Sequence, residues 1–321
     1  MKILITGGAG FIGSHLAGHF LSSGDEVTVL DNLSTGRLEN VEIFSQNPRY
    51  FFVKGDVCDA AVISPLIKNC DMIYHLAAAV GVQLIVEQPV HTITTNIFGT
   101  ETVLKAAAEF DKKLMLASTS EVYGKNSKIP FSEEDDTTLG CTRLNRWSYA
   151  CSKMIDEFLA LAYHEKYSLP VVICRFFNTI GPRQTGRYGM VVPRFVRSAL
   201  AGRPIEIYGT GRQSRCFCNV SDIIRAMTSL MACPEAYGRV INVGSRELIT
   251  IIDLAKKVIE LTGSASEIKY LTYEQAYGRA FDDMQTRMPD LSRIGELIGY
   301  SPQKNLDETL QEIIAFEKEQ C

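Results

Sequence analysis

The sequence lacks a strong excess of charge and lacks any long apolar run. Its 321 residues include 33 Lys or Arg and 37 Asp or Glu, for a formal net charge of −4, which argues against nucleic-acid binding through bulk positive charge. No stretch of about 18 consecutive apolar residues occurs, so no membrane-spanning helix is expected. Met1 to Thr6, before the first glycines, are too few for a signal peptide. We therefore expect a cytoplasmic protein that binds neither membranes nor nucleic acids.

Metal-ligand patterns and a disulfide framework are also missing. The nine cysteines are an odd number and are scattered along the chain, which fits reduced thiols that serve as small apolar side chains. Cys216 and Cys218 form a C-x-C pair, but no second pair or nearby histidine completes a zinc set. No metal site is expected.

A glycine-rich turn stands near the start of the chain. The β-rich run Lys2 to Thr6 leads into Gly7, Gly10 and Gly13, with Phe11 and Ile12 between the last two glycines, and a helical pattern follows. A strand, a glycine turn and a helix N-terminus in this order form a cradle for a pyrophosphate. We expect these five residues to bind a dinucleotide.

The end of the next predicted strand indicates which dinucleotide the protein binds. This strand covers Glu26 to Leu30 and ends at Asp31, which is followed by Asn32 and lies 18 residues after Gly13. A carboxylate at this point binds a ribose 2′-hydroxyl and repels a 2′-phosphate. The prediction is therefore NAD, although Arg37 downstream leaves NADP open.

The remaining pattern alternates strands with helices. Further strands are expected at 51–54, 72–76, 113–117 and 171–175, with a helix that opens at Asn96. This alternation predicts an α/β protein with a Rossmann-type doubly wound parallel sheet. We expect residues 1–175 to bind the cofactor and 176–321 to form mainly a smaller α/β substrate lobe, with some chain returning to the sheet.

Tyr149 and Lys153 are the candidate catalytic pair. Four residues apart on a helix, they share one face. A nearby ammonium lowers the pKa of a phenol, so the pair can act as a general base for a sugar hydroxyl. The alternative is a half-buried tyrosine beside a solvated lysine.

The glycine turn, Asp56-Val57, Ser118-Thr119-Ser120 and Tyr149-x-x-x-Lys153 together resemble the extended short-chain dehydrogenase/reductase family, and within it the NAD-dependent nucleotide-sugar epimerases, dehydratases and decarboxylases. The resemblance implies that Tyr149 is the base, that Lys153 holds the nicotinamide ribose, and that Ser118 or Thr119 bonds the sugar O4. Further expected cofactor contacts are Asp56, Val57, Leu76, Ala77, Ala78, Asn96 and Ser118.

Residues after the fifth strand bear on the reaction. The string from Thr119 to Gly124 looks like that of UDP-glucuronate decarboxylases (UDP-xylose synthases), whereas dehydratases of the family carry an Asp where this chain has Ser120. Arg146 to Tyr149, Tyr277-Gly278 and Asp282 to Asp290 are similar to the same decarboxylases. By this resemblance Glu121 and Arg287 act at the C5 side of the sugar, and Arg287 binds its carboxylate.

Other features keep alternatives open. Ala77 to Val82 looks more like epimerases, so a UDP-glucose or UDP-glucuronate 4-epimerase is the second interpretation. A catalytically silent NAD-binding regulator is disfavoured because Tyr149 and Lys153 are both intact. Substrate contacts are expected from Ser120, Asn178, Val191, Tyr208, Arg215 and Arg287. By resemblance, we also expect a homodimer formed through helices at 96–109 and 149–167.

Overall fold

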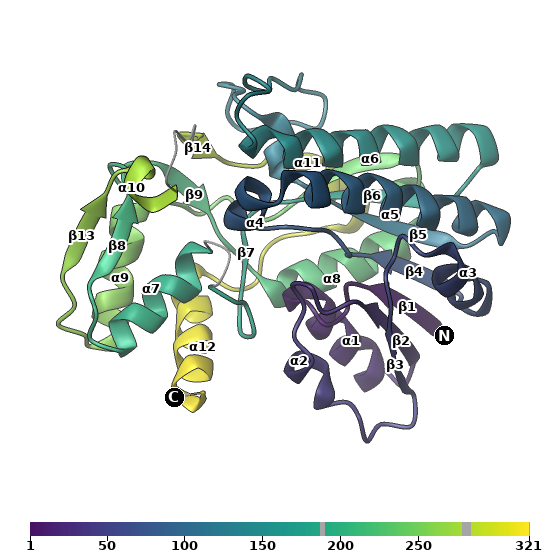
Figure 1. Ribbon diagram of the computed structural model, residues 1–321, viewed down its shortest axis with the longest axis horizontal. Helices are drawn as coiled ribbons and strands as arrows, with labels where there is room; N and C mark the ends of the chain where they lie inside the picture. Colours follow the sequence, from purple (N-terminus) through teal and green to yellow (C-terminus); the bar gives the residue numbers. More distant parts are fainter. Residues whose placement is uncertain (187–189, 278–283, 321) are drawn as a thin grey trace.

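A seven-stranded parallel sheet forms the centre of the protein (Figure 1). The computed structural model describes residues 1–186, 190–277 and 284–320. The strand order is β3-β2-β1-β4-β5-β6-β11, so the order reverses between β1 and β4, and the predicted doubly wound sheet is confirmed. The strands are β1 Lys2–Thr6, β2 Glu26–Asp31, β3 Tyr50–Lys54, β4 Met72–His75, β5 Lys113–Thr119, β6 Val171–Phe176 and β11 Arg239–Val243.

Helices cover both faces of this sheet because successive strand residues point in opposite directions. Ile3 and Ile5 pack in one core with α1 and α8, whereas Leu4 between them packs in a second core with α3, α5 and α6. The helices of the first face are α1 Phe11–Ser22, α8 Val220–Met231 and α11 Ser292–Ile298. Those of the second face are α3 Ala60–Asn69, α5 Pro89–Glu109 and α6 Arg146–Tyr167.

A smaller lobe lies beside the sheet, at the left of Figure 1. Its own apolar core joins three amphipathic helices to β8. Its helices are α7 Val191–Leu200, α9 Ile251–Thr262, α10 Tyr273–Tyr277 and α12 Leu306–Glu319. Its short strands are β7 Thr179–Ile180, β8 Ile205–Tyr208, β9 Ser214–Cys216, β10 Cys218–Asn219, β12 Leu248–Thr250, β13 Ile268–Leu271 and β14 Thr286–Arg287. Short helices elsewhere are α2 Glu39–Glu42, α4 Val82–Glu87, η1 Ser120–Tyr123 and η2 Pro234–Ala236.

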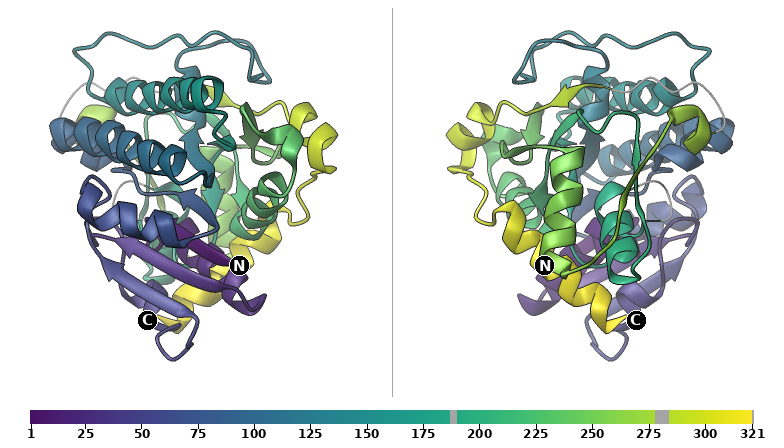
Figure 2. Two further views of the ribbon diagram at one scale, coloured as in Figure 1. Left: turned by 90° about the vertical axis from the view of Figure 1, so that its right-hand side faces the viewer. Right: turned by 90° about the vertical axis from the view of Figure 1, so that its left-hand side faces the viewer.

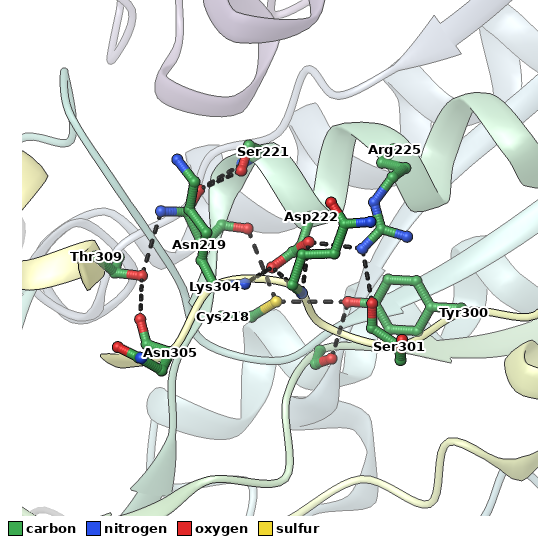
Figure 3. Close-up of polar contacts among 12 residues, drawn as sticks. Cys218, Asn219, Ser221, Asp222, Arg225, Tyr300, Ser301, Lys304, Asn305 and Thr309 are labelled. Atoms are coloured by element: carbon green, nitrogen blue, oxygen red, sulfur yellow. Dashed lines mark hydrogen bonds and ion pairs between the residues drawn. The ribbon is translucent and has the colours of Figure 1, made fainter. Parts of the chain in front are cut away.

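Asp222 fixes the segment that crosses from α11 to α12, as Figure 3 shows. Its buried carboxylate accepts hydrogen bonds from the backbone amides of Gln303 (3.0 Å) and Lys304 (3.1 Å) and from Arg225 (2.6 Å). Asn219, directly before α8, accepts from Ser221 N at 2.8 Å and caps the helix. The start of α8 therefore ties the sheet region to the lobe.

Two helix starts differ from the sequence expectation. Helix α5 begins at Pro89, so Asn96 lies inside it; proline suits a first helical position because its missing N–H is not needed there. Helix α6 begins at Arg146, which puts Tyr149 in its first turn. The segment between η1 and α6 is a long loop at the outer edge of the molecule (Figure 2). Of the described residues, none forms a helix long and apolar enough to cross a membrane.

Candidate active site

A cavity of about 500 Å³ lies at the carboxyl ends of the sheet strands and extends to the smaller lobe. Its walls include residues after β1, β2, β4 and β5, the first turn of α6, and residues of α7, β8 and β14. Ligands of open α/β sheets bind at this edge, where the strand order reverses. The cavity therefore joins the predicted cofactor site to the predicted substrate site.

The glycine turn leaves room for a pyrophosphate. A Cβ on Gly13 would lie 2.5 Å from the Gly7 carbonyl oxygen, and a Cβ on Gly7, where φ is +71°, would lie 2.7 Å from Ala77 N. No side chain caps α1 at Gly10. The first amides of this 12-residue helix, together with its dipole, are thus available to an anion. These features fit a dinucleotide.

Asp31 closes the far end of the cofactor half. Its carboxylate is 8% exposed and accepts hydrogen bonds from Ala9 N (3.0 Å) and Leu33 N (2.8 Å). Burial raises its pKa, and these two amides oppose the rise. A Cβ on Gly36 would lie 2.8 Å from the carboxylate oxygens. The close packing leaves little space for a phosphate and fits a ribose diol.

Tyr149 lines the cavity, whereas Lys153 does not. Nζ of Lys153 donates to Asp156 Oδ2 at 2.7 Å, and both side chains are buried. Burial raises the pKa of Tyr149, Glu121 and Asp156 raise it further, and a hydrogen bond with Thr119 opposes them. The pKa of Tyr149 is thus raised in the protein alone and not lowered as the sequence predicted, and the Lys153 ammonium is paired with Asp156.

Glu121 lies between arginines next to Tyr149. It contacts Arg287 at 2.6 Å and Arg146 at 3.2 Å. Burial alone would raise its pKa, but Arg146, Arg287 and Arg215 lower it to about 2. Three guanidinium groups therefore face one carboxylate at this end of the cavity, which leaves an excess of positive charge for an anionic ligand.

Strand β14 brings Arg287 to this cluster. It runs parallel to β9, with Arg287 in register with Arg215. Next to it, Phe131 donates through its backbone N–H to Met288 O and accepts through its carbonyl from Asp290 N, both at 2.8 Å. The loop before α6 and the segment around β14 thus hold each other in place.

Comparisons with known proteins agree with this geometry. Residues 4–313 match the family model described as GDP-mannose 4,6 dehydratase. The chain is 39% identical to a UDP-N-acetyl-alpha-D-glucosaminuronate decarboxylase of Bacillus cytotoxicus, over 99% of this chain and 98% of the relative. It is 36% identical to UDP-glucuronic acid decarboxylase 1 of Xenopus tropicalis, over 98% of this chain and 72% of the relative. The chain belongs to the extended short-chain dehydrogenase/reductase family.

A solved structure is also similar to this chain. UDP-glucuronic acid 4-epimerase from Bacillus cereus, in complex with UDP-glucuronic acid and NAD, is 29% identical and matches with a TM-score of 0.90 over 100% of both chains. This extended reductase is thus an enzyme of an NAD-dependent family of nucleotide-sugar decarboxylases and epimerases. When bound, NAD accepts a hydride from the sugar and can return it.

Most of the predicted cofactor residues line the cavity. They are Gly7, Gly10, Phe11, Ile12, Gly13, Asp31, Asn32, Val57, Leu76, Ala77, Ala78, Ser118 and Tyr149. Asp56, Asn96 and Lys153 do not. The Asp56 carboxylate accepts from Cys58 N at 2.9 Å. Asn96 accepts from Ala79 N at 2.8 Å and donates to Ser152 at 3.0 Å, so it supports the wall of the cavity from behind.

The predicted substrate residues all line the same cavity. They are Ser120, Asn178, Val191, Tyr208, Arg215 and Arg287, together with Thr119 and Glu121. Of the decarboxylase-like stretch, Gly278, Asp282 and Asp283 lie outside the described residues, and so does the part of the approach to α7 at 187–189.

Sequence reasoning missed several cavity residues. The Arg194 guanidinium stacks 3.8 Å from the Tyr208 ring centre, and Gln213 donates to Tyr208 O at 3.0 Å. Tyr273 also lines this part. These residues meet only through packing of the lobe, and their sequence spacing gives no signal. Arg146 was part of the decarboxylase-like stretch that the sequence analysis named, but it was not predicted to be a site residue itself.

Proposed function

We propose that this enzyme is a UDP-glucuronate decarboxylase that works through a sugar oxidised at C4. The observation that carries the proposal is the Glu121 carboxylate held by Arg287 and Arg146 next to Tyr149. A hexuronate brings an additional carboxylate to this end of the cavity. Arginine suits such a planar anion because its guanidinium group offers two parallel hydrogen bonds.

The side chains divide the work in this proposal. Tyr149 takes the proton of the C4 hydroxyl, and Thr119, its hydrogen-bond partner, helps to orient that hydroxyl. Loss of this proton together with the C4 hydride, for which bound NAD would be the acceptor, gives a 4-ketone, which is a β-keto acid. Its C5–C6 bond breaks, CO2 leaves, and the electron pair moves to the C4 oxygen, which Tyr149 and Thr119 stabilise as an enolate. Arg287 binds the carboxylate before it leaves, and the ionised Glu121 lies at the C5 side, where the enolate takes up a proton from solvent.

A 4-epimerase is the second candidate. The segment Ala77-Ala78-Ala79 at the cavity wall looks like that of epimerases, and the matching Bacillus cereus structure is a UDP-glucuronic acid 4-epimerase. Both reactions begin with oxidation at C4, so the same base serves either. Dehydration is disfavoured because the position before Glu121 is Ser120, which has no acid to protonate a leaving hydroxyl.

One assay separates these outcomes. Purified protein and NAD are incubated with UDP-glucuronate carrying ¹³C at C6, and the headspace CO2 and the nucleotide sugars are followed by mass spectrometry and NMR. Labelled CO2 with a UDP-pentose or UDP-4-keto-pentose supports the proposal. UDP-galacturonate without CO2 identifies the epimerase instead. The acetamido sugar named for the Bacillus cytotoxicus relative is run in parallel, and CO2 from that substrate alone would overturn the choice of UDP-glucuronate.

We also propose that two copies of the chain pair through α5 and α6. These helices pack side by side on one face of the sheet. Their outer surface exposes Val90 (73%), Phe98 (57%) and Phe158 (67%), an apolar patch of the kind found in protein interfaces. Sedimentation equilibrium should give a dimer for the protein and a monomer for Phe158→Asp. A monomer at micromolar concentration for the unchanged protein would contradict this.

A further inference from the structure

We propose that Asp156 is a positioning residue that holds the Lys153 ammonium and thereby controls how readily Tyr149 releases its proton. This inference rests on the proposed role of Tyr149 as base. Asp156 is 0% exposed and Lys153 is 2% exposed. Asp156 Oδ2 accepts a hydrogen bond from Lys153 Nζ at 2.7 Å. The lysine expected to act on the tyrosine thus has a fixed partner of its own.

The local sequence explains this pairing. Asp156 follows Lys153 by three residues on α6, so the two side chains lie on one face of the helix, and Tyr149 precedes Lys153 by four. A carboxylate and an ammonium that are both removed from water gain little stability as a pair, because desolvation offsets their attraction. A buried pair beside the reaction site is therefore better explained by its effect on the neighbouring phenol than by stability.

A series of polar contacts runs from the sheet through α5 toward Asp156. Thr6 Oγ1 and His75 Nδ1 are 2.7 Å apart, and His75 Nε2 and Thr100 Oγ1 are 3.1 Å apart. The Thr100 hydroxyl in turn lowers the pKa of the Asp156 carboxylate against the raising effect of burial. This series of contacts begins directly before the glycine turn, since Thr6 precedes Gly7, and its last member, Thr100, lies close enough to Asp156 to favour its charged form.

The charged groups around the phenol give the direction of the effect. On α6 these are Lys153, Asp156 and Glu157, and Glu157 pairs with Arg175 of β6 at 2.7 Å. From β4, His75 is held neutral because burial and Lys153 lower its pKa to about 3. From η1, Glu121 raises the pKa of Tyr149, as Asp156 does. Removing the negative charge at Asp156 therefore favours loss of the proton from the pair formed by Tyr149 and Lys153.

The test measures this proton directly in the NAD-loaded protein without sugar. Tyrosine labelled with ¹³C at Cζ is incorporated, the Tyr149 resonance is assigned by its loss in Tyr149→Phe, and its shift is followed between pH 6 and 11. We expect Asp156→Asn to titrate at least about 1 pH unit lower than the unchanged protein. Asp156→Ser also removes the carboxylate, so it should shift the titration in the same direction.

Glu317→Gln is the matched control, because it removes another buried carboxylate, paired with Arg197 at 2.7 Å in the lobe; it should leave the titration unchanged. Titration of Tyr149 at the same pH in Asp156→Asn and the unchanged protein, or no titration of either up to pH 11, would overturn the inference. If Asp156→Asn does not fold, an unshifted titration in Asp156→Ser would overturn it in the same way. The readout needs no turnover, so a failed decarboxylase assay would count against the proposed function alone.

Discussion

Replacing Glu121 by Gln should destabilise the protein by about 3 kcal/mol at pH 7. The surrounding arginines lower the pKa of this carboxyl from its ordinary value of 4.5 to about 2. A difference of about 2.5 pH units corresponds to about 3 kcal/mol, at about 1.4 kcal/mol per unit. The glutamine keeps the shape but leaves Arg146 and Arg287 facing each other without the charge that joins them, which is the costly way to break a buried pair.

The folded and unfolded pKa values of Glu121 also determine how the destabilisation by Glu121→Gln depends on pH. Because the pKa is lower in the folded protein, the contribution of Glu121 is complete above the unfolded value near 4.5 and is lost as the pH falls through the folded value of about 2. The difference between the two proteins should therefore be constant from pH 8 to about pH 5.5 and shrink below that. Urea unfolding followed through the single tryptophan, Trp147, which is buried next to Arg146, measures it.

Glu134→Gln is the control for this prediction. Glu134 also pairs with an arginine, Arg293, but its carboxylate is 79% exposed, so its loss should cost only about 0–1 kcal/mol. If Glu121→Gln costs no more than Glu134→Gln at pH 7, or if its cost does not change with pH, the arginines do not hold Glu121 as the structure indicates, and the argument for an anion site at this position fails.

Three further predictions concern the cofactor half and the fold. Gly13→Ala should reduce NAD affinity at least tenfold by calorimetry, because its Cβ would lie 2.5 Å from Gly7 O; unchanged affinity would remove the cradle from the site. Asp31→Ser should narrow the preference for NAD over NADP by about 10-fold or more, since a buried carboxylate no longer opposes the 2′-phosphate; an unchanged ratio of dissociation constants would contradict this. Asp222→Ala should lower the free energy of unfolding by about 3 kcal/mol, because two partly buried amides and Arg225 lose this acceptor. A loss below about 1 kcal/mol would show that other contacts hold the crossing segment.

The sheet could be predicted, and most of the expected cofactor residues line one cavity at its edge, because the signals for both are local. The glycine spacing around Gly7 to Gly13 and the acid at the end of the second strand each specify a backbone conformation or a contact within a few residues. The spacing of Tyr149 and Lys153 likewise placed both on one helix, as the structure confirms. The pairing of Lys153 with Asp156 could also have been predicted, since Asp156 lies one turn further along the helix. The sequence does not show that both side chains are buried, and their burial is what strengthens the electrostatic effect of the pair.

The charge balance of the site could not be predicted, because it depends on contacts between distant segments. Arg287 meets Glu121 only through the parallel pairing of β14 with β9 and the two backbone hydrogen bonds of Phe131. Neither contact has a signature in the sequence near Glu121. The sequence likewise indicated a lowered pKa for Tyr149, whereas burial and the carboxylates of Glu121 and Asp156 raise it, and the contribution of Glu121 comes from a separate segment.

Glu121 connects the two ends of the site. It raises the pKa of Tyr149, and its own charge is held in place by Arg146 and Arg287. A substrate anion that binds these arginines competes with the same carboxylate that acts on the base. Binding at the arginine end and proton removal at the tyrosine end are therefore not independent. Glu121→Gln should accordingly lower the Tyr149 titration in the NMR experiment as well as the stability, whereas Asp156→Asn should lower the titration without weakening the arginine cluster.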